Sequence, residues 1–130
     1  MPKRILIVDD DAHIRLLLRR TLEDLEREGV EIHAAEDGVE GLEKCRALLP
    51  DLVFLDVMMP RMNGMDCCKA IRKDPDLVAV HVIILTARGQ TQPPFDLRFG
   101  PHEFLTKPFD PDHIISRAAE VLSIDLDLGF

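Results

Sequence analysis

The feature that most constrains this chain is a regular alternation of short apolar runs with segments of helical spacing, repeated five times. Runs this short, rich in Val and Ile, are typical of strands buried on both faces. Strands separated by helices need crossover connections, so they lie parallel in one sheet with helices on both faces. The alternation therefore predicts a five-stranded doubly wound α/β fold. The five predicted strands are residues 4–8, 30–35, 52–55, 80–85 and 104–106.

Helix boundaries are indicated by capping residues and by breakers. Asp11 suits the N-cap of the first helix, whose apolar spacing stops at Gly29. Asp37 suits the N-cap of a second helix, which Pro50 ends. A third helix is predicted over about 65–72, and a last helix runs from Asp110-Pro111-Asp112 to about residue 122, with proline at the favoured first position.

The segment between the fourth and fifth strands departs from this pattern. A helix is expected there, but Pro93-Pro94 excludes a regular one through that point. We therefore expect a short or distorted helix over residues 90–101.

Length and composition limit the class of protein. A chain of 130 residues suits one domain, which we assign to residues 1–123, with 124–130 as a C-terminal tail or the start of a linker. No apolar run approaches the roughly 20 residues that span a membrane, and no signal peptide is evident, so we expect a cytoplasmic protein without a membrane partner. The net charge of −8 argues against direct binding of nucleic acid.

Polar residues stand at the carboxyl ends of four predicted strands, where doubly wound sheets bind ligands. Three of them are carboxylates, which repel one another unless a cation lies among them. A hard divalent ion such as Mg²⁺ suits such a cluster. The residues are Asp9 and Asp10 after the first strand, Asp56 after the third, Thr86 after the fourth and Lys107 after the fifth.

A carboxylate beside a divalent cation, a hydroxyl group and an ammonium group is suited to accept a phosphoryl group. The cation and Lys107 neutralise the oxygens of the transferring group, and Thr86 donates a hydrogen bond to one of them. Asp56 is the best candidate nucleophile, because its strand lies between the acidic pair and the two donors.

Four stretches of the chain, taken in order, resemble the receiver domain of bacterial two-component response regulators, of the chemotaxis-receiver type. The resemblance covers essentially the whole chain. It implies a flavodoxin-like sheet with strand order 2-1-3-4-5, which agrees with the count of strands above. The stretches are residues 5–11, 53–64, 84–88 and 104–109.

The resemblance implies a role for each residue at the predicted site. Asp56 matches the aspartate that takes a phosphoryl group from a histidine kinase. Asp9 and Asp10 match the acidic pair that holds Mg²⁺, and the backbone carbonyl of Met58 matches a further ligand. Asp56 itself is expected to share that ion.

The remaining matched positions are those of a conformational switch. Thr86 matches the hydroxyl that moves toward the phosphoryl group, and Lys107 matches the lysine that pairs with it. Phe104 matches the aromatic residue that turns inward in concert with the threonine. Met58 and Arg88 match two variable positions that tune the lifetime of the phosphoryl group.

The function implied is that of a phosphoacceptor rather than of a turnover enzyme. Receivers catalyse only their own phosphorylation and dephosphorylation, and the modification shifts an equilibrium between inactive and active conformations. The partners implied are a sensor histidine kinase or phosphotransfer protein upstream and a partner protein or effector domain downstream.

Two other functions stay open at this point. The altered 90–101 segment allows a receiver-like interaction module that works without phosphorylation. A flavodoxin-like redox protein or a magnesium phosphohydrolase is a further alternative on a related fold. The three aspartates after the first strand would repel a flavin phosphate, and a phosphohydrolase would use Asp9 rather than Asp56 as nucleophile.

Overall fold

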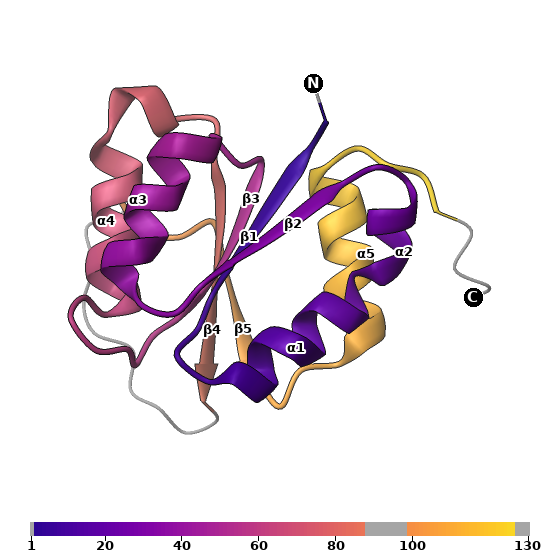
Figure 1. The fold of residues 1–130 in the computed structure, drawn as a ribbon, viewed down its shortest axis with the longest axis horizontal. Helices are drawn as coiled ribbons and strands as arrows, with labels where there is room; N and C mark the ends of the chain where they lie inside the picture. The colour runs from indigo at the N-terminus through magenta and orange to yellow at the C-terminus, as the bar shows by residue number, and fades with distance from the viewer. Residues whose placement is uncertain (1, 88–98, 127–130) are drawn as a thin grey trace.

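The computed structural model describes residues 2–87 and 99–126, which form an α/β sandwich around one parallel sheet (Figure 1). The strand order is β2-β1-β3-β4-β5, so the predicted topology is confirmed. The strands are β1 (Arg4–Val8), β2 (Glu31–Ala35), β3 (Leu52–Asp56), β4 (His81–Ala87) and β5 (Glu103–Lys107).

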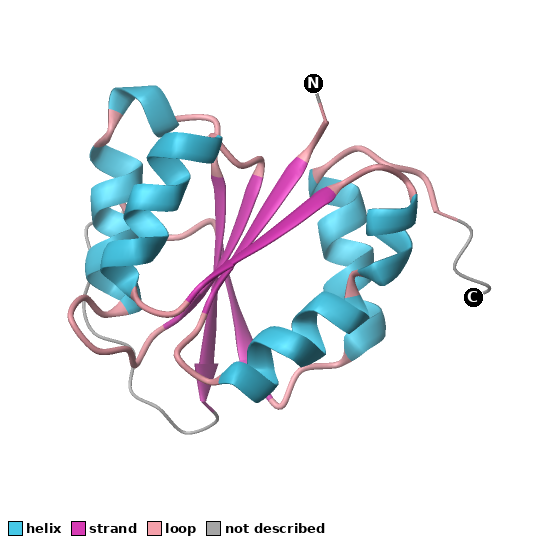
Figure 2. Ribbon diagram, viewed as in Figure 1, coloured by secondary structure: helices cyan, strands magenta, loops and turns pink. Residues whose placement is uncertain are grey.

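Helices cover both faces of the sheet (Figure 2). One layer holds α1 (Ala12–Thr21), α2 (Glu23–Arg27) and α5 (Pro111–Val121). The other layer holds α3 (Gly38–Leu48) and α4 (Gly64–Lys73), and the 3₁₀ helix η1 (Pro75–Leu77) follows α4.

Each strand sends alternate side chains into two separate apolar layers, as the period of two along a strand requires. In β1, Ile5 and Ile7 join the layer under α1 and α5, whereas Leu6 and Val8 join the layer under α3 and α4. All four side chains are at most 1% exposed. Burial on both faces explains why these strands are continuous apolar runs in the sequence.

The predicted caps are present, but the first predicted helix is divided. The side chains of Asp11, Asp37 and Asp110 each accept a hydrogen bond from a backbone N–H in the first turn of their helix. The chain leaves helical geometry at Leu22, which separates α1 from α2. The hydroxyl of the preceding Thr21 donates to the carbonyl of Leu17 at 2.8 Å, a contact that is associated with bent helices.

The expected short or distorted helix over 90–101 falls mainly outside the described residues. At the other end of the domain, Ile124 and Leu126 pack against the layer under α1 and α5, and the Ile124 N–H donates to the Ala119 carbonyl at 2.9 Å. The division between residues 123 and 124 stays a prediction. Among the described residues, none of the helices has the length and apolar character that a bilayer span requires.

Candidate functional site

The strand ends bring the predicted site residues to one edge of the sheet. Asp56 and Lys107 are the last residues of β3 and β5, Asp9 directly follows β1, and Thr86 is the penultimate residue of β4. All strands are parallel, so their carboxyl ends meet on one side, as predicted. The site therefore depends on topology rather than on closeness in the sequence.

Three carboxylates converge at this edge. One oxygen from each of Asp9, Asp10 and Asp56 lies within 4.8 Å of the others. Asp9 is 1% exposed and Asp56 is 8% exposed, whereas Asp10 is exposed and forms the solvent side of the cluster.

Lys107 supplies the positive charge that faces this cluster. Its Nζ lies 2.9 Å from Asp9 Oδ2 and 3.1 Å from Asp56 Oδ1. Burial favours the neutral amine, but the hydrogen bonds and charges of Asp9 and Asp56 outweigh burial and raise the pKa of Lys107. The ammonium group therefore bridges the two buried carboxylates. The peptide bond from Lys107 to Pro108 is cis.

The contacts of Lys107 with Asp9 and Asp56 do not balance the negative charge of the three carboxylates. Burial, and then the charge of Asp9, raise the pKa of Asp56, and its hydrogen bond to Lys107 only partly offsets them. The cluster holds three carboxylates but one ammonium group, which contacts two of them, so the remaining negative charge favours an additional cation.

The donor set fits a hard divalent cation. Magnesium holds its ligands at about 2.1 Å, so two oxygens on one ion lie about 3 to 4.2 Å apart. Carboxylate oxygens within 4.8 Å of one another need only a small contraction to reach that spacing. The exposed Asp10 leaves one side open for entry and for water ligands.

The predicted switch residues occupy different environments. Thr86 is 2% exposed, and its hydroxyl donates to the Ala87 carbonyl at 3.2 Å. Phe104 is half-buried and packs against the apolar layer under α3 and α4. Met58 lies in the loop after Asp56 with its side chain directed to solvent. Arg88 lies outside the described residues.

Gly64, which is not among the predicted site residues, begins α4 directly beside Asp56. A Cβ atom on Gly64 would lie 2.0 Å from the carbonyl oxygen of Asp56. Only glycine allows α4 to begin this close to the strand end. The Gly64 N–H also donates to the Val57 carbonyl at 2.9 Å. The sequence signal that could have found this role is the Asn-Gly pair directly before a helical segment.

Comparisons with known proteins agree with this architecture. The sequence model described as the response regulator receiver domain matches residues 5–119. The alkaline phosphatase synthesis transcriptional regulatory protein PhoP of Bacillus subtilis is 36% identical over 94% of the chain and 49% of PhoP. The DNA-binding dual master transcriptional regulator RpaA of Synechocystis is 37% identical over 92% of the chain and 48% of RpaA.

A solved structure gives the same result for the fold. The CheY-like response regulator receiver domain protein of Methanospirillum hungatei superposes with a TM-score of 0.80 at 28% identity. The match covers 93% of this chain and 94% of that one.

The prediction that nucleic acid is excluded as a partner is wrong. The chain spans about half the length of PhoP and RpaA, and RpaA is named as DNA-binding. The net charge of −8 describes only the 130 residues of this chain. In a longer regulator, a segment with its own charge can bind DNA, so the acidity of the matched half excludes nothing about the whole.

Proposed function

The chain belongs to the response regulator receiver domain family, and on this premise we propose that Asp56 is its phosphoacceptor. The observation that carries the proposal is the position of Asp56, largely buried at the end of the central strand, with Asp9 beside it and Lys107 bonded to it. The phosphodonor is the phosphohistidine of a sensor kinase or phosphotransfer protein.

The reaction exchanges one bond to phosphorus for another. A carboxylate oxygen of Asp56 forms a bond to phosphorus, and the P–N bond of the phosphohistidine breaks, with its electrons leaving on the imidazole. Lys107 is held where it would neutralise an oxygen of the transferring group. The chain promotes its own phosphorylation and subsequent hydrolysis by water, and in this sense it is not a turnover enzyme.

We assign the cation site to Asp9, Asp10, Asp56 and the backbone carbonyl of Met58. Magnesium, when bound, neutralises negative charge on the phosphoryl oxygens and orients them for transfer. The carboxylates of Asp9 and Asp56 are held in place by burial and by Lys107.

Transmission of the signal is assigned to Thr86 and Phe104. The Thr86 hydroxyl exchanges its bond to the Ala87 carbonyl for one to the phosphoryl group, and Phe104 turns further toward the layer against which it already packs. Phosphorylation thereby shifts an equilibrium between two conformations. The switch acts on a partner protein or on an effector domain. A DNA-binding domain, as a transcriptional regulator requires, is one kind of effector domain. The proposal includes a cytoplasmic location for the chain.

Intact-mass measurement tests the phosphoacceptor directly, since the chain has no tryptophan to serve as a fluorescent reporter. Incubation with acetyl phosphate and Mg²⁺ is expected to add one phosphoryl group to the wild type. Asp56→Asn is expected to remove the adduct, whereas Asp76→Asn, the same change at an exposed carboxylate, retains it.

An adduct that persists in Asp56→Asn would contradict the assignment of the nucleophile. If neither acetyl phosphate nor a phosphorylated kinase produced an adduct on the folded, Mg²⁺-bound protein, the phosphorylation-independent interaction module would replace this proposal.

A further inference from the structure

The loop that joins Asp56 to α4 rests on the N-terminus of α3 through an ion pair. The Arg61 guanidinium contacts both carboxylate oxygens of Asp37, with Nε 2.9 Å from Oδ2 and Nη2 3.1 Å from Oδ1. The side chain of Asp37 is 12% exposed, whereas that of Arg61 is 60% exposed. A fork of this kind fixes orientation as well as distance.

The backbone of the loop is in contact with the same helix end. A Cβ atom on Gly38, the first residue of α3, would lie 2.2 Å from the carbonyl oxygen of Met62. Arg61 itself has a φ of 65°, in the left-handed region that residues other than glycine seldom adopt. Arg61 therefore makes the ion pair from a backbone conformation that is costly for a residue with a Cβ atom.

Asp37 serves the helix and the loop together. Its Oδ1 accepts from the Glu40 N–H at 2.9 Å as the N-cap of α3. That backbone hydrogen bond, together with the Arg61 guanidinium, outweighs burial and lowers the pKa of the Asp37 carboxyl. The carboxylate is therefore a fixed anchor for Arg61.

The anchored loop is the one that carries the assigned carbonyl ligand. Gly64 holds one end of the loop against the Asp56 carbonyl, and Arg61 holds the middle of the loop against α3. Met58 lies between these restraints and Asp56. Movement of the loop away from α3 would shift the Met58 carbonyl relative to the carboxylates.

We propose that Asp37 and Arg61 are positioning residues that set the affinity of the acidic site for Mg²⁺ by fixing the loop that carries the Met58 carbonyl. This inference rests on the proposed function, since it takes the Met58 carbonyl as a ligand. Neither residue contacts the ion in this scheme.

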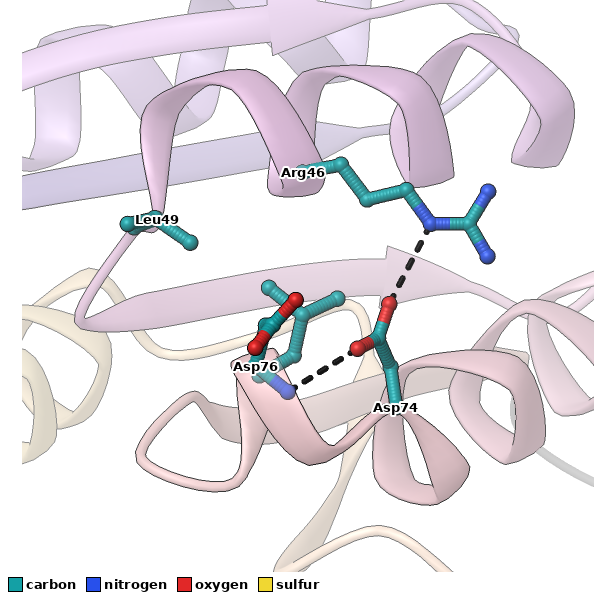
Figure 3. Close-up of a pocket in the computed structure, with 5 residues that line it drawn as sticks. Arg46, Leu49, Asp74 and Asp76 are labelled. Atoms are coloured by element: carbon teal, nitrogen blue, oxygen red, sulfur yellow. Dashed lines mark hydrogen bonds and ion pairs between the residues drawn. The ribbon is translucent and has the colours of Figure 1, made fainter.

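A second ion pair on α3 provides the matched control (Figure 3). Arg46, near the C-terminal end of α3, lies with Nε 3.3 Å from Oδ2 of Asp74. Asp74 is also a capping residue, since it accepts from the Asp76 N–H at 2.9 Å. The two pairs have similar exposure, 57% and 17% for Arg46 and Asp74, but the second pair borders a pocket with Leu49 and Leu77 at the opposite end of the helix.

The test is Mg²⁺ affinity, measured by calorimetry on the full chain without any phosphodonor. Asp37→Asn retains a good N-cap and removes the charge that holds Arg61. Arg61→Gly removes the guanidinium and suits the left-handed backbone. Both variants are expected to bind Mg²⁺ about tenfold more weakly, at the low end of the loss seen for outer-shell residues of metal sites. Asp74→Asn and Arg46→Ala are expected to match the wild type within about twofold.

Asp37→Asn removes a negative charge and Arg61→Gly removes a positive one. Because the two changes are opposite in sign, they distinguish an effect on loop position from a direct electrostatic effect on the ion. By charge alone, Asp37→Asn would weaken and Arg61→Gly would strengthen cation binding. Loss of affinity in both variants supports positioning, whereas shifts of opposite sign, or no shift in either, overturn it. A wild type that forms the Asp56 adduct while the variants keep full Mg²⁺ affinity would refute only this inference. A wild type without Mg²⁺ binding or adduct would refute the proposed function.

Discussion

The two ends of β5 carry charged residues in opposite electrostatic situations. At the amino end, Glu103 is bonded through both oxygens to Arg117, at 2.8 and 2.7 Å, and to His81 Nε2 at 2.9 Å. At the carboxyl end, Lys107 is shared by Asp9 and Asp56, with Asp10 close by. At one end a single carboxylate is bonded to the Arg117 guanidinium, whereas at the other end three carboxylates surround one ammonium group.

The pKa shifts follow this difference. Hydrogen bonds from Arg117, and then from His81, lower the pKa of Glu103 to about 2 despite partial burial. Burial and the charge of Asp9 raise the pKa of Asp56 even though Lys107 is bonded to it. The comparison indicates that the amino end is neutralised within the protein and contributes to stability. The carboxyl end retains unfavourable negative charge, which a bound cation would relieve.

The largest expected effect comes from removing the shared cation. Lys107→Met leaves two buried carboxylates facing each other, which is expected to lower the free energy of unfolding by about 3 kcal/mol without Mg²⁺. Added Mg²⁺ should recover part of this loss. Chemical denaturation with and without Mg²⁺ checks both expectations. Lys69→Met, the same substitution at an exposed lysine, serves as the control. Equal losses of unfolding free energy in Lys107→Met and Lys69→Met would show that the carboxylates at this end do not need Lys107 for stability.

A smaller effect is expected at the amino end, with a defined pH dependence. Glu103→Gln removes the ionic partner of Arg117, at an expected cost of about 1 kcal/mol at neutral pH. Because the folded pKa of Glu103 lies below its ordinary value, this stability is present above pH 4.5 and is lost as the pH falls toward about 2. The difference in unfolding free energy between the wild type and Glu103→Gln should therefore become smaller as the pH is lowered from 7 to 3. A difference that stayed constant over this range would indicate that packing, not charge, is lost.

The smallest effect is expected to have the opposite sign. Asp56→Asn removes a charge that the fold disfavours, so the variant without Mg²⁺ is expected to melt about 3 °C higher at neutral pH, which corresponds to about 1 kcal/mol. Because burial and Asp9 raise the folded pKa of Asp56, the advantage should be absent below pH 3.8 and should grow as the pH rises through the raised pKa. Thermal melts at several pH values provide the test. Destabilisation at neutral pH would mean that the bond from Lys107 outweighs burial.

Much of the fold could be predicted from sequence because strands and helix starts follow local patterns, and the rule for parallel sheets then predicted which residues gather at the carboxyl edge. Apolar runs marked the strands, Asp11 and Asp37 were predicted as caps, and Asp110-Pro111-Asp112 marked the start of the last helix. The break at Leu22 was not predicted, because the helical spacing of apolar residues continues through it. The prediction that excluded nucleic acid failed for a different reason. It used the net charge of these 130 residues to judge what a longer regulator can bind.

The sequence by itself determined which polar side chains meet at the carboxyl edge of the sheet, because the strand-ending aspartates and Lys107 are read directly from the order of residues and the rule for parallel sheets. Only the tertiary structure decided how charges are shared. That Lys107 bridges Asp9 and Asp56, or that Arg61 reaches Asp37, depends on distances between segments far apart in the chain. Such pairings arise from the packing of whole elements, so no local pattern of residues encodes them.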